Sequence, residues 1–286
     1  MIEHVKDVYR TLPESVQEWL RENRLARTAW KTNVVYGYFK RDIKNGIGYI
    51  VHPNELTNYT YDIGDLNKKH LSGFVSAITG DSIAETEKYI RELESDDQLR
   101  DHVRKSQRYD SRYREPKYGG RLGWYALVRA LKPNLVVESG VDDGLGTCVI
   151  SAALMRNGQQ GVQGRVHGID IDPKAGTLYS PPYSNYGEIT HSPTVPVLED
   201  LKEDIDVFIH DSSHEEEHIE AELDAISENL SGDSILISDA AHHLDTLYEY
   251  SRRNDRYFLF FREEPASHWY RGGFGVSFYD DVRTEK

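Results

Sequence analysis

Aspartate and histidine residues recur together in two short stretches of the sequence and could carry out catalysis. Asp211 and His214 belong to the stretch FIHDSSH, and Asp239 and His242 belong to the stretch SDAAH. A histidine with a pKa near neutrality suits a general base, and two neighbouring carboxylates can bind a divalent cation such as Mg²⁺. We therefore predict catalytic roles for Asp211, His214 and His242, and a metal site at Asp211 and Asp239. The alternative is that both aspartates only cap helices.

A glycine-rich turn, residues 139–147 (SGVDDGLGT), follows the first of the predicted buried strands. Glycine at such a turn lets a ligand approach the backbone and the N-terminus of the helix that follows. A dinucleotide site has the spacing G-x-G-x-x-G beside a pyrophosphate, whereas Asp142 and Asp143 fill this turn and favour a cationic ligand without phosphate. The next predicted strand ends at Asp170, where a carboxylate can accept hydrogen bonds from the ribose hydroxyls of an adenosine.

The pattern of hydrophobic runs predicts the scaffold that must position these residues. Four short runs, polar only at their C-terminal ends, are typical of buried parallel strands: residues 135–138, 165–170, 205–211 and 234–239. Helices are predicted between them at 145–157, 214–229 and 242–253, and two aromatic strands follow at 257–261 and 275–279. We therefore predict an α/β fold with an open, doubly wound sheet, whose ligand site lies at the carboxyl ends of the strands.

The sequence before residue 118 lacks the strong strand signals of the later part. Tyrosines among glycine and asparagine over residues 34–63 predict short strands and turns. Two capping boxes, at Thr11 and Ser82, predict the beginnings of helices. We therefore predict an α+β accessory region over residues 1–118 and a catalytic domain over residues 119–286.

Composition excludes several classes of protein. The chain has 286 residues, of which 38% are hydrophobic, and this is enough for a folded core. A single cysteine, Cys148, excludes a disulfide framework and a cysteine-built zinc site. No apolar run approaches the roughly 18 residues of a membrane span, so we predict no integral membrane segment and a cytoplasmic location. The formal charge of −14 disfavours nucleic acid as a partner, because phosphate is also negative.

In their order along the chain, these motifs resemble those of class I S-adenosylmethionine-dependent methyltransferases, in the branch that methylates oxygen atoms of small molecules. The resemblance covers residues 119–280 and rests on E-x-G-x-x-x-G at 138–144, GID at 168–170 and D-x-x-H at 211–214. A fifth strand that ends in Asp239 and two antiparallel strands at the end of the chain are also similar. Two features depart from the family pattern. Asp142 replaces the middle glycine of E-x-G-x-G-x-G, and no acidic residue near His191 matches the family's carboxylate beside adenine.

The resemblance implies a Rossmann-like, doubly wound sheet of seven strands with an antiparallel last strand. It implies S-adenosylmethionine as the cofactor, and Mg²⁺ as a second one in metal-assisted members. The residues that it assigns to the cofactor are Glu138, Gly140, Gly144, Thr147, Asp170, Ile171 and Asp211. The expected reaction is methyl transfer to an oxygen of a small-molecule acceptor, with a saccharide or glycan intermediate as the first prediction. A nicotinamide-dependent sugar oxidoreductase and a non-catalytic subunit with the same fold remain alternatives, and homo-oligomer formation is left open.

Overall fold

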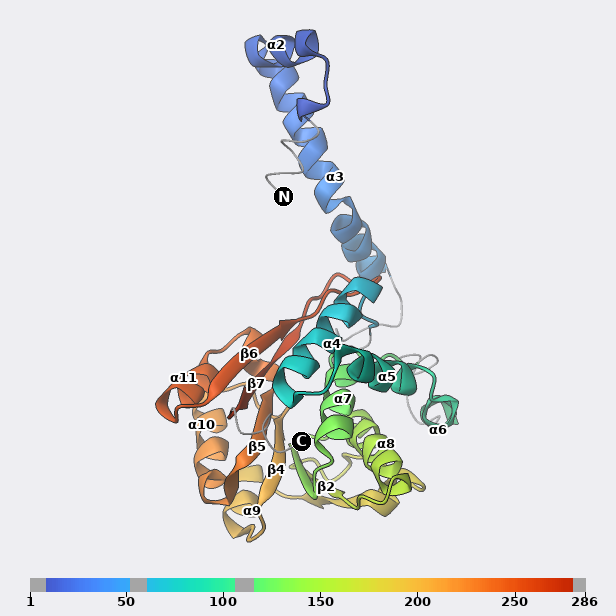
Figure 1. Cartoon of the computed structure of the whole chain (residues 1–286), viewed down its shortest axis with the longest axis vertical. Helices are drawn as coiled ribbons and strands as arrows, with labels where there is room; N and C mark the ends of the chain where they lie inside the picture. Colours follow the sequence, from blue (N-terminus) through green and yellow to red (C-terminus); the bar gives the residue numbers. More distant parts are fainter. Residues whose placement is uncertain (1–8, 52–60, 106–115, 280–286) are drawn as a thin grey trace. The chain divides into compact units, whose positions relative to one another are not determined.

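The structure, a computed structural model, describes residues 9–51, 61–105 and 116–279. These residues belong to two units, Met1–Pro53 and Asn54–Lys286, and every described strand lies in the larger unit (Figure 1). Within the described ranges, no helix combines the length and the apolar character needed to cross a membrane.

A seven-stranded sheet forms the centre of the larger unit (Figure 1). Its strands are β1 (Leu135–Ser139), β2 (Arg165–Asp170), β3 (Gly187–His191), β4 (Ile205–His210), β5 (Leu230–Ser238), β6 (Tyr257–Arg262) and β7 (Gly273–Phe278). Their order is β3-β2-β1-β4-β5-β7-β6, and β7 runs antiparallel to both of its neighbours while β1 to β5 run parallel. The predicted strands and the doubly wound sheet with an antiparallel last strand are therefore confirmed.

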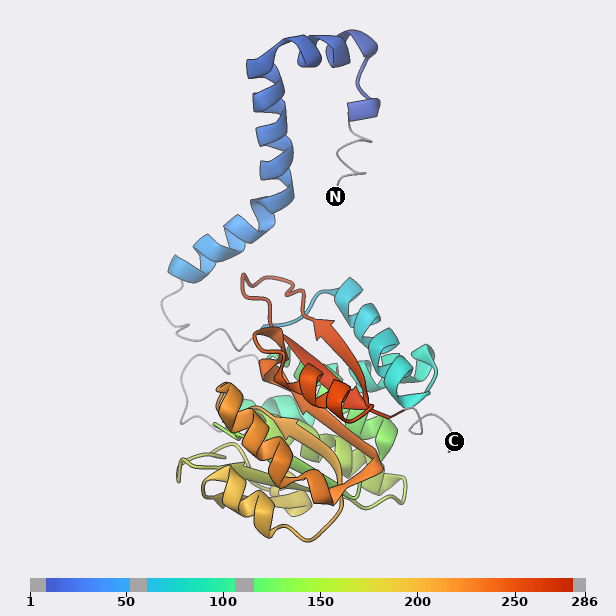
Figure 2. The same cartoon turned by 90° about the vertical axis from the view of Figure 1, so that its left-hand side faces the viewer.

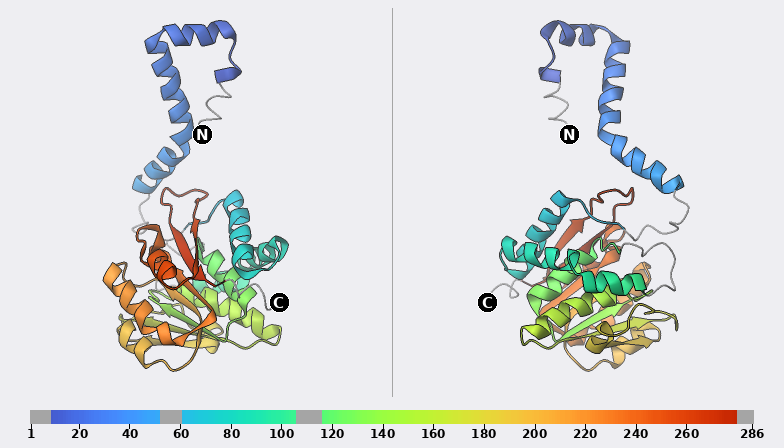
Figure 3. Two further views of the ribbon diagram at one scale, coloured as in Figure 1. Left: turned by 60° about the vertical axis from the view of Figure 1, so that its left-hand side comes forward. Right: turned by 90° about the vertical axis from the view of Figure 1, so that its right-hand side faces the viewer.

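Helices cover both faces of the sheet because its central strands are apolar on both sides (the two views of Figure 3). Along β1, Val136 packs into one core cluster, whereas Leu135 and Val137 pack into the other. The first cluster is built by α4 (Asp65–Thr79), α5 (Ile83–Glu94), α6 (Asp97–Lys105), α7 (Arg121–Leu131) and α8 (Leu145–Gln159). The second is built by α9 (Thr194–Asp200), α10 (Glu216–Ala225) and α11 (Thr246–Arg253). A strand that is apolar along its whole length needs cover on both faces, because its alternate residues point to opposite sides of the sheet.

The carboxyl ends of β1, β4 and β5 meet at one edge of the sheet. Ser139 pairs with His210 across β1 and β4, and His210 pairs with Ser238 across β4 and β5. The next residue of each strand therefore begins a loop at the same edge, as ligand sites of doubly wound sheets require. The loop after β5 is the short 3₁₀ helix η4 (Asp239–His242); two others are η2 (Tyr183–Tyr186) and η3 (Ser227–Asn229).

The N-terminal unit contains α2 (Glu14–Glu22) and the long helix α3 (Arg24–Val51), shown in Figure 2. The prediction of short strands and turns over residues 34–63 is therefore wrong for residues 34–51, and residues 52–60 lie outside the described ranges. Tyr36, Phe39 and Ile43 recur at intervals of three and four residues, which is the helical period. The alternation of Tyr36 with Tyr38 resembles a strand over too short a stretch to outweigh that period.

One of the two predicted capping boxes is confirmed. The hydroxyl of Ser82 accepts a hydrogen bond from the Glu85 amide at 3.2 Å, and α5 begins directly after Ser82. The prediction at Thr11 is wrong, because Pro13 occupies the N-cap of α2 with a φ of −54° and no side chain caps that helix.

Residues 61–105 pack with the sheet. Both α4 and α5 contact α7, and all three helices share the first core cluster. The assignment of residues 1–118 as accessory and 119–286 as catalytic stays a prediction. The structural division lies elsewhere, because the larger unit begins at Asn54.

Candidate active site

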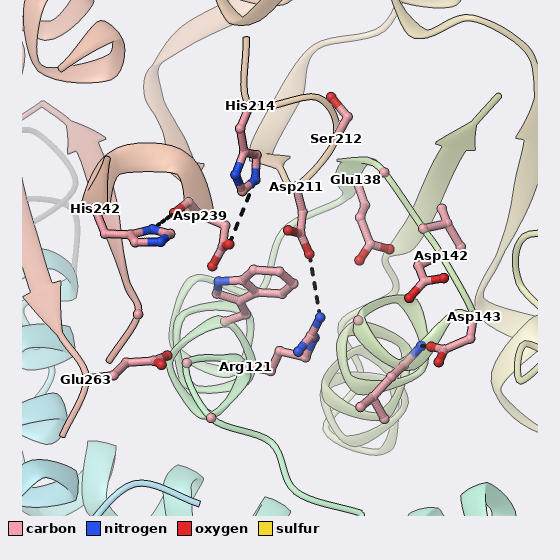
Figure 4. Close-up of a pocket in the computed structure, with 18 of the residues that line it drawn as sticks. Arg121, Glu138, Asp142, Asp143, Asp211, Ser212, His214, Asp239, His242 and Glu263 are labelled. Carbon is pink, nitrogen blue, oxygen red and sulfur yellow. Dashed lines mark hydrogen bonds and ion pairs between the residues drawn. The ribbon is translucent and has the colours of Figure 1, made fainter. Parts of the chain in front are cut away.

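A cavity of about 400 Å³ opens at the edge of the sheet where β1, β4 and β5 end. Figure 4 shows Asp142 on one side of it and Glu263 on the other, with Asp211, His214 and Asp239 between them. The glycine-rich wall consists of Glu138 and the turn residues Gly140, Val141, Asp142, Asp143, Leu145 and Gly146. The aromatic wall consists of Tyr61, Trp124, Glu263 and Tyr270.

The glycine-rich turn has a shape that only glycine permits at its first position. Gly140 has a φ of +86°, and a Cβ there would lie 2.2 Å from the carbonyl oxygen of Asp211. One carboxylate oxygen of Asp170 accepts hydrogen bonds from the backbone N–H groups of Val141 and Asp142, at 2.8 and 2.9 Å. The protein itself therefore holds the turn in place.

Glu138, at the end of β1, presents a buried carboxyl group to the cavity. Its exposed fraction is 1%, and the hydroxyl of Thr147 donates a hydrogen bond to it. Gly146 makes room for it, since a Cβ there would lie 2.1 Å from Oε1 of Glu138. Burial raises the pKa of Glu138 to about 7, because the charged form loses its hydration. A cation bound beside this carboxyl would stabilise the ionised form.

Asp211, His214 and Asp239 form a cluster in the middle of the cavity. One potential ligand atom from each lies within 4.8 Å of the others. Nε2 of His214 lies 4.0 Å from Oδ2 of Asp239, and Nη2 of Arg121 lies 3.6 Å from Oδ2 of Asp211 (Figure 4). Burial, reinforced by the charge of Asp239, raises the pKa of Asp211 well above its usual range. Burial lowers the pKa of His214, although Asp239 acts in the opposite direction, so this imidazole is neutral at pH 7.

The donor set of this cluster fits a divalent cation. Carboxylate oxygens, here from Asp211 and Asp239, are the ligands that Mg²⁺ and Mn²⁺ prefer, whereas an imidazole nitrogen suits ions such as Zn²⁺. A cation among them would also remove the repulsion between Asp211 and Asp239. The helix-capping alternative for the two aspartates is wrong, because neither α10 nor η4 has a side-chain cap, and their N-caps are Glu215 and Ser238.

His242 has both ring nitrogens engaged. Nδ1 lies 2.6 Å from the carbonyl oxygen of Asp239, which can only accept, so Nδ1 carries the proton. In the neutral ring, Nε2 then accepts a hydrogen bond from the hydroxyl of Tyr270, 2.7 Å away. His242 therefore positions Tyr270, and His214 is better placed to accept a proton from a ligand.

A buried network lies behind the cluster. Glu222 of α10, with an exposed fraction of 0%, accepts hydrogen bonds from Ser139, His210, Ser212 and His218. Ser139 precedes the glycine-rich turn, and Ser212 belongs to the segment after β4. One carboxylate thus fixes two segments of the cavity against each other.

The structure brings six of the predicted residues to this cavity: Glu138, Gly140, Asp211, His214, Asp239 and His242. Gly144, Thr147, Asp170 and Ile171 are absent from its lining. Thr147 orients Glu138, Asp170 holds the turn, and Ile171 is 72% exposed. Contact of these four residues with a cofactor stays a prediction.

Sequence analysis missed the aromatic wall and Arg121. Tyr61 and Glu263 are hydrogen-bonded although they are 202 residues apart, and a β-bridge between Ile63 and Pro265 brings their segments together. Trp124 lies in the first turn of α7, whose apolar residues could have predicted a buried helix but carry no motif of a site.

Residues 137–240 match a family model described as a methyltransferase domain. No curated protein matches the chain. The match to a methyltransferase domain covers β1 to η4 and thus both the glycine-rich wall and the cluster. The match favours a methyltransferase over a nicotinamide-dependent oxidoreductase.

Several solved structures are similar to this chain at low sequence identity. A putative O-methyltransferase from Klebsiella pneumoniae is 13% identical, covers 68% of this chain and 96% of its own, and has a TM-score of 0.48. The methyltransferase PaMTH1 of Podospora anserina, solved with S-adenosylhomocysteine (SAH), is 14% identical over 76% of this chain and 97% of its own, with a TM-score of 0.46. The O-methyltransferase TomG of Streptomyces achromogenes, solved with S-adenosylmethionine, is 13% identical over 65% and 90%, with a TM-score of 0.44. With TM-scores this low, function is inferred from the family match and the cavity instead.

Proposed function

We propose that this chain, whose residues 137–240 match a methyltransferase domain, transfers the methyl group of S-adenosylmethionine to a hydroxyl oxygen of a small molecule. The observation that carries this proposal is the cluster of Asp211, His214 and Asp239 within 4.8 Å, beside the glycine-rich wall of the same cavity. A methyl donor on that wall and a hydroxyl group at the cluster would meet in the same cavity. Holding both reactants in line supplies much of the acceleration in such a transfer.

The glycine-rich wall suits the cationic donor. Glu138, Asp142 and Asp143 line it, and S-adenosylmethionine carries a sulfonium and an ammonium group but no phosphate. A hydrogen bond from a charged donor to a buried carboxylate is worth about 1.5–3 kcal/mol. Glu138 is the residue to which such a bond is expected to matter most, because its carboxyl is 1% exposed and burial raises its pKa despite the charge of Arg121.

The cluster suits activation of a hydroxyl. His214 is the proposed general base, since it is neutral at pH 7 and its Nε2 lies at the cavity beside Asp239. We propose that Asp211 and Asp239 hold a divalent cation such as Mg²⁺ and leave the imidazole of His214 free to act as the base. When bound, the cation would lower the pKa of the acceptor hydroxyl. Arg121 would then restrain Asp211 from the opposite side.

A saccharide or glycan intermediate is the proposed acceptor. The support is the polar character of the aromatic wall, where Tyr61, Glu263 and Tyr270 offer hydroxyl and carboxyl groups and Trp124 offers an aromatic ring. Several hydroxyl groups of one sugar could each find a partner there.

The test combines binding with turnover. We expect calorimetry to give a micromolar Kd for SAH and no binding of NAD. Methyl transfer to a panel of saccharides is expected to require Mg²⁺ or Mn²⁺ and to stop with EDTA. Activity that EDTA leaves unchanged would reject the metal role. Binding of SAH without turnover on any acceptor would favour a non-catalytic subunit.

A further inference from the structure

Glu263 is a buried carboxyl group that takes no part in the proton transfer or the methyl transfer proposed above. Its exposed fraction is 5%, yet it lines the cavity and points into it (Figure 4). The hydroxyl of Tyr61 donates a hydrogen bond to it, and the backbone N–H of Gly120 donates another. Gly120 allows this approach, because a Cβ there would lie 2.2 Å from Oε1 of Glu263. Two neutral donors leave half of the acceptor capacity of the carboxylate unused.

Trp124 supplies a buried donor on the same wall. Its exposed fraction is 2%, it lines the cavity, and its Nε1 has no hydrogen-bond partner among the described residues. The Cζ3 edge of the indole lies against Gly146, 3.2 Å from the place of a Cβ there. Nε1 lies at the opposite end of the ring and therefore points away from the glycine-rich wall. A buried N–H of this kind normally has an acceptor, so a ligand oxygen is expected beside it.

The charges of the cavity favour a cation at this place. Of the described residues that line it, Glu138, Asp142, Asp143, Asp211, Asp239 and Glu263 are acidic, and Arg121 is the one lysine or arginine. The cationic donor would lie with the first three, and Arg121 and the divalent ion would lie with Asp211 and Asp239. Glu263 is then the carboxylate without a positive partner. A carboxylate on the acceptor would be repelled, whereas an ammonium group would pair with Glu263.

We propose that Glu263 and the indole N–H of Trp124 form a subsite for an amino group of the acceptor, so that the preferred acceptors are saccharides with a protonated amine. The ammonium donates to the carboxylate of Glu263, and a neighbouring oxygen of the sugar accepts from Trp124. This inference rests on the proposed function and narrows its substrate class. The subsite selects the acceptor and orients its hydroxyl toward His214.

Three methyl glucosides that differ only at carbon 6 test the proposal: one has an aminomethyl group, one a hydroxymethyl group and one a carboxylate. Ligand-detected NMR titrations at pH 8 would give their Kd values with and without SAH. The amine is expected to bind about tenfold more tightly than the neutral sugar, and the carboxylate most weakly. Glu263→Gln should reduce the preference for the amine to less than about twofold. Trp124→Phe should weaken all three sugars by a similar factor, since it removes the donor to a shared oxygen.

Glu264→Gln is the matched control. It removes the same charge from the neighbouring residue, which lies outside the cavity and pairs with Arg271 at 3.5 Å. This variant should keep the preference for the amine. Equal binding of the amine and the neutral sugar, a preference that survives Glu263→Gln, or an amine that does not bind at all would each overturn the proposal. Binding of SAH separates the amine subsite from the proposed function. If the parent protein does not bind SAH, the proposed function is wrong. If Glu263→Gln binds SAH with an unchanged Kd, the variant is folded and its sugar preference can be interpreted.

Discussion

The two walls of the cavity differ in how far apart their residues lie along the chain. The glycine-rich wall comes from one strand and the turn that follows it, Glu138 to Gly146. The aromatic wall joins Tyr61, from the segment before α4, to Trp124 of α7 and Glu263 after β6. A local wall is fixed by short-range turn geometry, and an assembled wall depends on the packing of the whole larger unit. Substitutions in the glycine-rich wall should therefore abolish cofactor binding. Substitutions in the aromatic wall should change the affinity for the acceptor and leave cofactor binding intact.

Gly140→Ala is expected to have the largest effect. A Cβ at this position would collide with the carbonyl of Asp211, and the φ of +86° adds strain. Displacing the turn from the segment after β4 should lower kcat/KM by about 100-fold or more and eliminate measurable SAH binding.

Gly161→Ala separates strain from collision. Gly161 has a φ of +88°, but nothing lies within 4 Å of the place of its Cβ. This variant should lose about 1 kcal/mol of stability in urea unfolding and keep full activity. If Gly140→Ala and Gly161→Ala lost activity equally, the close contact between the turn and Asp211 would not explain the loss of activity in Gly140→Ala.

His214→Ala should lower kcat by about 100-fold and leave the Kd of SAH unchanged. In the parent protein, kcat should fall as the pH drops through the lowered pKa of His214, because the protonated ring cannot accept a proton. The variant should lack this acidic limb in its pH profile. Turnover within about threefold of the parent would remove His214 from the role of base.

Glu138→Gln should stabilise the ligand-free protein and weaken its cofactor binding. The carboxyl has a pKa of about 7 in the folded protein and about 4.3 in an unfolded chain. Between these values the unfolded state has released the proton while the folded state still holds it, so stability falls as the pH rises from about 4.3 to 7.

At pH 8 the glutamine variant avoids this cost, and its Tm should exceed that of the parent by about 5 °C. At about pH 4, below the pKa of the unfolded chain, the two Tm values should be nearly equal, which provides an internal control. Its Kd for SAH should rise by about tenfold or more. A Tm difference that does not depend on pH would show that Glu138 is ionised without a ligand.

The sequence predicts features that depend on neighbouring residues or on the ends of strands. Asp211, His214 and Asp239 could be placed at one cavity because each follows a buried parallel strand, and such strands end at a common edge. Tyr61 and Glu263 could not be paired, because only the bridge between Ile63 and Pro265 joins their segments.

Two predicted cofactor residues show a second limit on what can be predicted from the sequence, which concerns the role of a residue in the site. The resemblance predicts that Asp170 and Thr147 contact the cofactor, and the structure shows that their side chains hydrogen-bond to Val141, Asp142 and Glu138. A motif gives the residue type and its place at the end of a strand. It does not say whether the side chain contacts the ligand or fixes a residue that does.

Tyr61→Phe is expected to have the smallest effect and tests whether the assembled wall acts apart from the local one. The variant removes one hydrogen bond to Glu263 and should lower the free energy of unfolding by about 1 kcal/mol. With one donor fewer, the pKa of Glu263, already raised to about 7 by burial, should rise further, so binding of the aminated glucoside should require a higher pH. The Kd of SAH should not change. Tyr257→Phe, at an exposed tyrosine of β6, controls for loss of a hydroxyl and should match the parent in both measurements. A change in SAH affinity on Tyr61→Phe would show that the two walls are coupled, because Tyr61 lies on the wall opposite the cofactor.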